Sequence, residues 1–327
     1  MPVLVTGGAG YVGSHACKAL SRSGYQPVTV DNLANGHEWA VKWGPMEKGD
    51  VADADFLLEV VRKYRPVAVL HFAAFAYVGE SVAAPGKYYQ NNVVGALRLL
   101  ETCRASGINA FVFSSSCATY GVPETVPIAE TQHQSPINPY GESKLMVEKF
   151  LRDYSTAYGL RSASLRYFNA AGADPEGDIG EMHEPETHLV PLVLKATTGE
   201  RERITIFGND YATPDGTCIR DYVHVTDLAD AHVRALKYLL AGGETTALNL
   251  GTGKGHSVLQ VVEAAERVTG KPVWRTEGPR RAGDPPELVA DPARAKRVLG
   301  WQPGLQGIDE IVATAWAWHR KHPGSVS

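Results

Sequence analysis

The sequence predicts an α/β fold in which a doubly wound parallel sheet of the Rossmann type is joined to a smaller α/β lobe that binds substrate. In the first half, short apolar runs alternate with stretches of helical pattern. A glycine-rich loop directly follows the first run, and the composition shifts to Gly, Pro and acidic residues after Tyr167. Repeated strand–helix units predict a parallel sheet that is covered by helices on both faces.

Each element is expected from its local pattern. Buried parallel strands consist of short runs rich in Val, Leu and Phe, and such runs occupy residues 3–6, 27–31, 67–71 and 110–114. Helical patterns lie between them at residues 15–23, 55–64 and 92–105, and residues 160–167 are expected to form a sixth strand. Beyond this point, residues 172–187, 208–216 and 278–286 have the composition of loops.

We therefore expect two domains. Residues 1–168 form the larger domain, to which residues 221–251 return, and residues 169–220 and 252–327 form the smaller lobe. In doubly wound folds, ligands bind outside the carboxyl ends of the strands. The smaller lobe is therefore expected to cover that edge of the sheet.

Composition excludes several kinds of partner. With a formal charge of −4, a pI near 6.3 and no basic block, the chain is a poor candidate for nucleic-acid binding. No apolar run approaches the about 20 residues of a membrane span, and the N-terminus does not resemble a secretion signal. The cysteines lack metal-binding spacing and suit a reducing compartment; they are Cys17, Cys103, Cys117 and Cys218. We expect a soluble, cytoplasmic protein without a metal ion.

The segment GGAGYVG at residues 7–13 predicts a dinucleotide site. It follows the first strand, opens the first helix and satisfies both GxGxxG and GxxGxxG. Glycines there permit a tight turn and let a pyrophosphate approach the helix N-terminus. Asp31 ends the second strand at the spacing expected for the acid that binds a ribose 2′-hydroxyl. Because a carboxylate repels a 2′-phosphate and no Arg follows it, the expected cofactor is NAD rather than NADP.

A second motif, YGESK at residues 140–144, places Tyr140 and Lys144 on the same face of a helix. A tyrosine with its ordinary pKa of about 10 is a poor base at neutral pH. A neighbouring ammonium and a positive nicotinamide would lower that pKa, so Tyr140 could take a proton from a sugar hydroxyl while hydride leaves the same carbon. Ser116, near the end of an expected strand, could hydrogen-bond the reacting oxygen or merely cap the strand end.

Along the chain, GGAGYVGSH, DNLANG, HFAA, SSSCATYG, NPYGESK, RYFNAAGA, GNDYATPDGTCIRDYVHV and LNLGTG resemble the motifs of UDP-glucose 4-epimerases of the extended short-chain dehydrogenase family, nearly from end to end. The resemblance implies that hydride passes from C4 of the UDP-linked hexose to bound NAD and returns to the opposite face of a 4-keto intermediate. It implies catalytic roles for Tyr140, Lys144 and Ser116. It also implies a homodimer formed through the helices that hold residues 92–105 and 141–158.

The motif and the resemblance together imply two sets of contacts. The cofactor contacts are Gly7, Gly10, Tyr11, Val12, Gly13, Asp31, Asn32, Asn35, Gly36, Asp50, Val51, Phe72, Ala73, Ala74, Asn91, Ser114, Tyr140, Lys144 and Phe168. The substrate contacts are Ser116, Tyr140, Asn169, His188, Leu189, Phe207, Arg220, Arg281, Asp284 and Leu288. Two arginines suit a diphosphate, which they can bind in bidentate fashion, and a carboxylate suits ribose hydroxyls.

Several of these residues also have plainer interpretations. Arg220 could form a structural ion pair with the adjacent Asp221, and His188 could be an ordinary loop histidine. Phe207 and Leu288 could belong to the core. The chain also departs from some family members, since Ala76 stands where they have a lysine and Leu288 where they have a tyrosine.

Other activities fit the same residues less well. A sugar-nucleotide 4,6-dehydratase needs an Asp–Glu pair beside the strand-end hydroxyl, and Cys117-Ala118-Thr119 supplies no acid. A keto-sugar reductase would consume NADPH, which Asp31 disfavours, and an NAD-sensing module would have lost Tyr140 or Lys144. The sequence leaves open whether the preferred sugar is a hexose, a pentose or an N-acetylhexosamine.

Overall fold

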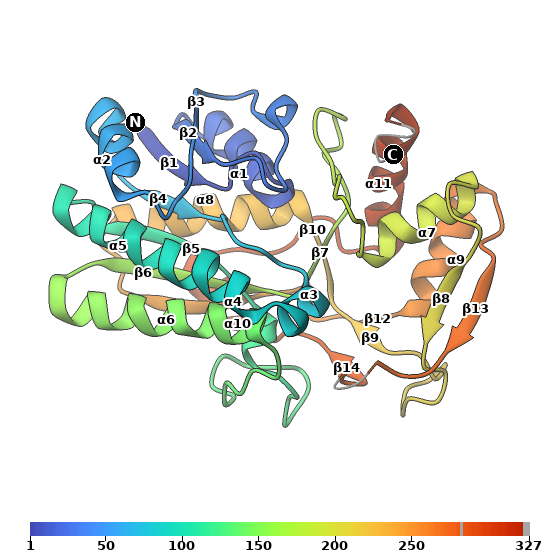
Figure 1. The fold of residues 1–327 in the computed structure, drawn as a ribbon. Coiled ribbons are helices and arrows are strands. Elements are labelled where there is room, and N and C mark those ends of the chain that lie inside the picture. Colours follow the sequence, from blue (N-terminus) through green and yellow to red (C-terminus); the bar gives the residue numbers. More distant parts are fainter. Residues whose placement is uncertain (282–283, 323–327) are drawn as a thin grey trace.

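The computed structural model describes residues 1–281 and 284–322, which form a large and a small lobe (Figure 1). The large lobe is built on a seven-stranded sheet with the strand order β11-β6-β5-β4-β1-β2-β3, in which every pairing is parallel. Its strands are β1 (Pro2–Thr6), β2 (Gln26–Asp31), β3 (Met46–Lys48), β4 (Val69–His71), β5 (Ala110–Ser116), β6 (Arg161–Tyr167) and β11 (Thr246–Leu250). The strand order reverses direction between β1 and β4, which is the point where doubly wound folds bind ligands.

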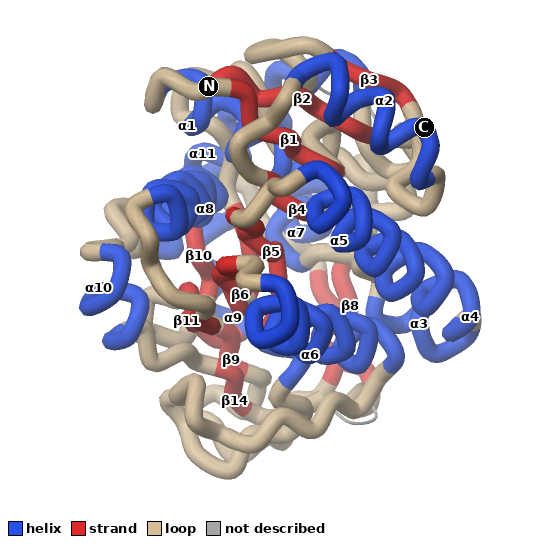
Figure 2. The backbone as a smooth tube through the Cα atoms, turned by 90° about the vertical axis from the view of Figure 1, so that its left-hand side faces the viewer, coloured by secondary structure: helices blue, strands red, loops and turns tan. Residues whose placement is uncertain are grey.

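Helices cover both faces of this sheet, as Figure 2 shows from the side. One face carries α1 (Tyr11–Arg22), α8 (Val225–Leu240) and α10 (Ala293–Leu299), and the other carries α2 (Ala54–Tyr64), α5 (Gly95–Ser106) and α6 (Pro139–Tyr158). Shorter helices of this lobe are α3 (Val78–Ala83), α4 (Pro85–Tyr88) and a π-helical turn at Tyr89–Val94.

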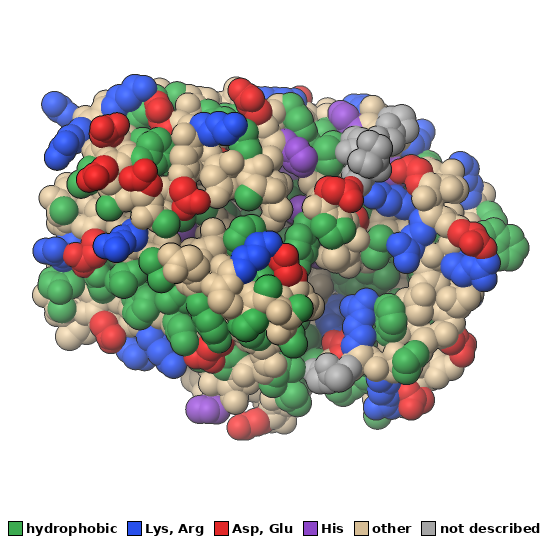
Figure 3. All heavy atoms as spheres, in the orientation of Figure 1, with side chains coloured by type: hydrophobic (Ala, Val, Ile, Leu, Met, Phe, Trp, Pro, Cys, Tyr) green, Lys and Arg blue, Asp and Glu red, His purple; other side chains and the backbone are tan. Residues whose placement is uncertain are grey.

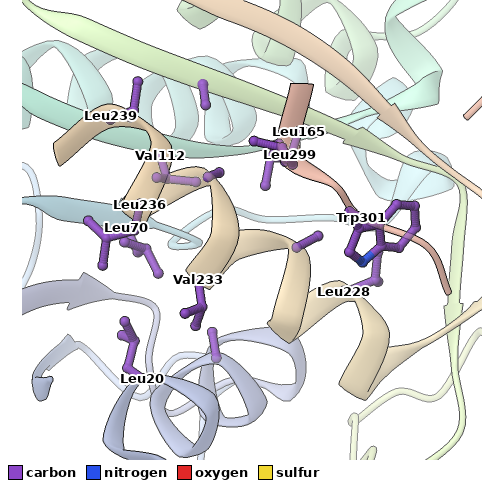
Figure 4. Close-up of a cluster of buried hydrophobic side chains, with 14 of the residues drawn as sticks. Leu20, Leu70, Val112, Leu165, Leu228, Val233, Leu236, Leu239, Leu299 and Trp301 are labelled. Carbon is purple, nitrogen blue, oxygen red and sulfur yellow. The ribbon is translucent and has the colours of Figure 1, made fainter. Parts of the chain in front are cut away.

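Each face of the sheet has its own hydrophobic core. Val3 and Val5 point into the core beneath α1 and α8, whereas Leu4 points into the core beneath α2 and α5. Successive strand side chains alternate between faces, so a continuous apolar run is buried on both sides. Figure 4 shows the first core, where Leu20, residues of α8 and Trp301 meet the sheet.

In the described residues, the small lobe consists of two strand pairs, one three-stranded sheet and three helices. Its strands are β7 (Asn169–Ala171), β8 (Ile204–Phe207), β9 (Ile219–Arg220), β10 (Tyr222–His224), β12 (His256–Ser257), β13 (Arg275–Gly278) and β14 (Glu287–Leu288). The helices α7 (Leu189–Thr198), α9 (Val258–Thr269) and α11 (Ile308–Lys321) share a third core with β8. β9 pairs with both β12 and β14, and β7 pairs with β10.

The predicted fold class is confirmed, with local differences. The sequence did not indicate β3, because its three residues are Met, Glu and Lys and none of them is fully buried. The domain boundaries remain a prediction: β11 joins the large sheet, while α10 and Trp301, which the prediction assigned to the small lobe, pack in the first core. Residues 282–283 of the predicted loop and 323–327 of the predicted lobe lie outside the described residues. No helix among the described residues is long and apolar enough to span a bilayer.

Candidate active site

The predicted cofactor residues lie mostly where strands of the large sheet end. The glycine loop follows β1, Asp31 closes β2, Phe72 follows β4, and Phe168 follows β6. Parallel strands have their carboxyl ends at one edge of a sheet, so these segments, far apart in sequence, meet at that edge. On the face shown in Figure 3, a hollow lies between the two lobes, with Lys and Arg side chains on its small-lobe side.

The glycine loop has the geometry that a pyrophosphate requires. Gly7 has a φ of +76°, and a Cβ there would lie 2.4 Å from the Ala73 nitrogen. A Cβ on Gly13 would lie 2.1 Å from the Gly7 carbonyl oxygen. No side chain caps the N-terminus of α1, and its first turn holds no acidic residue. The first N–H groups of the helix therefore face an anion site without a competing carboxylate.

Asp31 is held rigidly beside this loop. Its Oδ2 accepts a hydrogen bond from the Ala9 amide at 3.0 Å, and its Oδ1 accepts one from the Leu33 amide at 2.8 Å. Burial raises the pKa of the Asp31 carboxyl, although these two amides oppose the rise. A Cβ on Gly36 would lie 3.0 Å from both carboxylate oxygens, so glycine keeps this approach open. Next to it, the side-chain amide of Asn32 donates to the Asp50 carboxylate at 3.0 Å. This hydrogen bond joins the ends of β2 and β3.

Two expected cofactor contacts have different surroundings from those the sequence suggested. The ring of Phe72 packs against His232, with the ring centroids 4.6 Å apart, so its side chain faces the first core rather than a groove. Asn91 donates to the side chain of Asn92 at 2.9 Å. Asn92 is the buried member, and it also bonds the Phe75 backbone and Ser143 Oγ. Nothing in the local sequence distinguished Asn92 from Asn91.

The start of α6 places the predicted catalytic pair at the end of β5. Asn138 caps the helix by accepting a hydrogen bond from the Gly141 amide at 2.8 Å, and Pro139 occupies the first turn. A Cβ on Gly141 would lie 2.5 Å from the Ala118 carbonyl oxygen, so glycine lets the helix approach the chain after β5. Tyr140 is 9% exposed, and Lys144 lies one turn further along the same buried face.

Burial dominates the ionisation of this pair. It raises the pKa of Tyr140 well above its ordinary value, with nearby Tyr167 adding to the rise and Ser116 opposing it. It lowers the pKa of Lys144 to about 7. The Lys144 ammonium lies 5.7 Å from the centroid of the Tyr140 ring and donates to the Ser114 carbonyl at 2.8 Å. Here burial therefore outweighs the lowering of the Tyr140 pKa that was expected from Lys144 and a positive nicotinamide.

The strand-end serines have separate partners. Ser116 Oγ accepts a hydrogen bond from the Ala118 amide at 3.1 Å, so the capping interpretation of this serine is correct. That contact occupies only one lone pair of a hydroxyl, which can still donate. Ser114 Oγ lies 2.8 Å from the Tyr167 hydroxyl.

Beneath these serines lies a buried ion-pair network that sequence analysis missed. Arg166 of β6 binds both carboxylate oxygens of Glu148 on α6, and the two side chains are 6% and 8% exposed. Glu148 also accepts from Ser115 at 2.6 Å, and Arg166 donates to the Tyr120 hydroxyl at 2.8 Å. The network joins β5, β6 and α6, so it holds the serines and Tyr140 in register.

The predicted substrate residues of the small lobe occupy strand ends and adjoining loops. Arg220 of β9 forms an ion pair with Asp284 rather than with Asp221. Asp221 instead accepts hydrogen bonds from the backbone of Thr252, Gly253 and Ala290. The Arg281 guanidinium stacks over the Phe207 ring at 4.3 Å from its centroid.

Three further predicted contacts are Leu288, Asn169 and Leu189. Leu288 of β14 packs partly buried against a cluster with Tyr120, Ile128, Phe168 and Ala290. Asn169 begins β7, and Leu189 is the first residue of α7. Phe168 and Leu288 therefore share one cluster, which connects the end of β6 to the small lobe.

His188 has an environment that the sequence did not suggest. It precedes α7, and its Nδ1 lies 2.8 Å from Glu181 and 3.2 Å from Glu186. His183 approaches the same two carboxylates at 3.3 and 3.7 Å. The available signal in the sequence was the spacing HxxExH at residues 183–188.

Comparisons with known proteins agree with this arrangement. The model of the NAD dependent epimerase/dehydratase family matches residues 3–251. A UDP-glucose 4-epimerase of Rhizobium meliloti (strain 1021) is 56% identical over 319 residues, which cover 98% of this chain and 97% of that protein. UDP-glucose 4-epimerase from Brucella ovis in complex with NAD is 53% identical, with a TM-score of 0.95 and 97% of each chain covered. The enzyme from Bifidobacterium longum in complex with NAD+ and UDP is 38% identical, with a TM-score of 0.94 over 99% of this chain and 100% of that one.

The chain belongs to the NAD-dependent epimerase/dehydratase family. The resemblance predicted from the sequence motifs is thereby confirmed, as is the prediction that the protein is an enzyme.

Proposed function

We propose that this member of the family interconverts UDP-glucose and UDP-galactose by epimerisation at C4. The observation that carries the proposal is the convergence of Tyr140, Lys144 and Ser116 at the sheet edge that also holds the glycine loop and Asp31. Curated relatives that are 56% identical over 98% of this chain carry the name of this activity. Structural neighbours in complex with NAD, and with NAD+ and UDP, support the same choice of ligands.

The proposed cofactor is NAD, because the residues present fit it. Gly7 and Gly13 leave room for the pyrophosphate at the uncapped start of α1, and the Asp31 carboxylate faces the position of a ribose. When bound, NAD accepts a hydride from C4 of the sugar and returns it, so the reaction consumes no external oxidant. The proposed binding residues are those named from the motif, with the backbone rather than the ring of Phe72 facing the cofactor.

Tyr140 is the proposed acid–base residue. It takes the proton of the 4-hydroxyl while the C4–H bond breaks, and it returns that proton when the bond is remade on the other face. The Ser116 hydroxyl is proposed to hydrogen-bond the same sugar oxygen. Lys144, buried beneath Tyr140, is proposed to hold a cofactor ribose and to supply positive charge when protonated.

The small lobe is proposed to hold UDP while the sugar remains free to turn. Arg220 and Arg281 would bind the diphosphate, and Asp284 would bind hydroxyls of the uridine ribose. Because Arg220 and Asp284 pair with each other in this structure, UDP binding is proposed to replace part of that pair. The binding energy then comes from UDP, which does not react. The sugar is left free to present either face to the cofactor.

Two further expectations belong to this proposal. A homodimer through α5 and α6 is supported by the exposure of Leu97 and Tyr158, which are 37% and 55% exposed on those helices. Size-exclusion chromatography with light scattering measures that state directly. We also propose a cytoplasmic location, because the cysteines suit a reducing compartment. The division into two domains is proposed from the change in composition after Tyr167.

The activity is tested with purified protein, UDP-galactose and no added cofactor. Formation of UDP-glucose, measured with a UDP-glucose-specific dehydrogenase after the reaction is quenched, is expected without added NAD. NAD should be recovered from the heat-denatured protein. A saturable requirement for added NADPH would contradict the proposal and favour a keto-sugar reductase.

A further inference from the structure

A cluster of two histidines and two glutamates lies in the segment that links the large sheet to α7. Its members are Glu181, His183, Glu186 and His188, each of which offers one donor atom within 4.8 Å of the other three. The Glu181 and Glu186 side chains are 6% and 4% exposed, His183 is 16% exposed, and His188 is 41% exposed. Both glutamates and His183 are therefore largely buried, and His188 is the most exposed of the four residues.

The donor atoms of the two histidines each lie close to both glutamates. Nδ1 of His183 lies 3.3 Å from Glu181 and 3.7 Å from Glu186, and Nδ1 of His188 lies 2.8 and 3.2 Å from the same residues. Four ligands at about 2.1 Å from a tetrahedral ion lie about 3.4 Å from one another. The observed separations scatter around that value.

Of these short distances, the one between His188 Nδ1 and Glu186 Oε1 is a hydrogen bond, and two other donor atoms of the cluster lack one. Among the described residues, Glu181 Oε1 and His183 Nδ1 are buried without a hydrogen-bond partner of acceptable geometry. Buried polar atoms are normally paired, so such an atom needs an explanation. A cation placed between the four donors would satisfy both atoms at once.

The charge in the cluster is also compatible with a bound divalent cation. Two buried carboxylates need two positive charges nearby, because burial of an unpaired ion is costly. Two protonated imidazoles could supply them: burial opposes their protonation, but the two carboxylates raise the pKa of His183 to about 9 and that of His188 to about 10, with the rings 5.2 Å apart. One divalent cation supplies the same charge and leaves both imidazoles neutral.

A second acidic cluster offers a contrast. Asp174, Glu176 and Asp178 also lie within ligand distance of one another. Lys18 occupies the centre of that cluster, with its ammonium at 2.6, 3.0 and 2.7 Å from the three carboxylates. The positive charge is already provided there, so no ion is expected.

We propose that Glu181, His183, Glu186 and His188 form a structural zinc site. Two imidazole nitrogens and two carboxylate oxygens are a donor set that suits tetrahedral Zn²⁺, and four protein ligands are typical of structural rather than catalytic zinc. The site includes none of the proposed catalytic residues Tyr140, Lys144 and Ser116, and zinc there would revise the expectation of a protein without metal. The inference does not depend on the proposed reaction.

The ion would tie together parts of both lobes. Tyr11 of the glycine loop donates to the Gly172 carbonyl at 2.6 Å, and the rings of Tyr11 and Tyr77 meet His183 edge-on. On the other side, the Trp318 indole of α11 donates to the Glu181 carbonyl at 3.2 Å. A zinc ion would hold this segment in place between the dinucleotide loop and the start of α7. The predicted contact of His188 with UDP would then involve Nε2 only.

The test measures zinc in the purified full-length protein. The wild-type chain is stripped with a chelator, exposed to Zn²⁺, freed of unbound metal by gel filtration and analysed by mass spectrometry of the metal. Stoichiometric zinc is expected. The variants His183→Gln and Glu181→Gln should bind zinc at least 10-fold more weakly, because even the outer partners of a metal ligand contribute about 10–100-fold. The control Asp178→Asn, from the cluster that holds Lys18, should bind zinc like the wild type.

A second measurement needs no variant. A ligand that binds only the folded state raises the melting temperature, so added Zn²⁺ should raise that of the stripped wild-type protein, and a chelator should reverse the rise. A wild-type chain that takes up no zinc would overturn the proposal. So would zinc binding that is unchanged in both variants, or that is lost in Asp178→Asn alone.

Discussion

Replacing Tyr140 by Phe tests the proposed base with little disturbance of its surroundings. The ring is 9% exposed and stays in place, while the hydroxyl that would take the substrate proton is lost. A general acid–base group contributes about 10²–10⁴ in rate, which corresponds to about 3–5 kcal/mol in the activation free energy. Tyr167 does not offer a ready substitute, because its hydroxyl lies 2.8 Å from Ser114 Oγ. We therefore expect turnover of UDP-galactose to fall by at least 100-fold, with NAD still bound.

Tyr167→Phe is the matched control. It removes a partly buried phenolic hydroxyl that contacts Ser114, and it should cost about one hydrogen bond, or about 0.5–1.5 kcal/mol of stability, without a comparable loss of turnover. The assay measures initial rates of both variants with UDP-galactose, together with urea unfolding and the NAD content. Near wild-type turnover in Tyr140→Phe would refute the assignment of the base. An equal loss in both variants would show that the defect is structural.

Three other predictions follow from the site. Lys144→Met should stabilise the cofactor-free protein to urea below about pH 7, and this gain should shrink as the pH rises toward 10.5. Burial lowers the Lys144 pKa from 10.5 to about 7 in the folded state. Between these pH values the folded wild-type chain binds fewer protons than the unfolded chain, so its stability rises with pH and the advantage of the variant shrinks. An advantage of Lys144→Met that grows with pH would contradict this. Asp31→Ala should weaken the preference for NAD over NADP in binding titrations, by removing the carboxylate that repels a 2′-phosphate, and an unchanged preference would assign the selection to other residues. Native protein should epimerise UDP-N-acetylglucosamine detectably, because Leu288 is shorter than Tyr, and Leu288→Tyr should suppress that reaction while sparing UDP-glucose; no N-acetyl turnover, or an unchanged ratio of rates, would place the gate elsewhere.

Much of the fold followed from local patterns because the large sheet is buried on both faces. Runs such as residues 3–6 and 110–114 are continuous and apolar, since both faces of each strand lie under helices. β3 was not predicted, because an edge strand of Met, Glu and Lys has no continuous apolar pattern. The return of residues 246–250 to the sheet was expected, but the burial of Trp301 in the first core depends on packing between distant segments.

Site residues were predictable where they belong to one motif. They were less predictable where the role of a side chain depends on a residue that is distant in sequence. The glycine loop, Asp31 and the Tyr140–Lys144 pair stand at fixed spacings, which a single sequence displays. Arg220 illustrates the limit, because its neighbour in sequence is Asp221 but its partner in space is Asp284. The Glu148–Arg166 pair was equally hidden, since 18 positions separate two residues that meet only when α6 packs on β6.

Tyr140 also shows how burial changes an argument made from spacing. A lysine four residues away suggested a lowered tyrosine pKa, yet both groups are buried and each is driven toward its neutral form. In the protein without cofactor, Tyr140 therefore keeps its proton, and Lys144 is only partly charged at neutral pH. Activation of the proposed base would then need further positive charge in the pocket, which an oxidised nicotinamide would supply. On this account Tyr140 would become a competent base only with the oxidised cofactor bound, so proton removal would be confined to the state that can also accept the hydride.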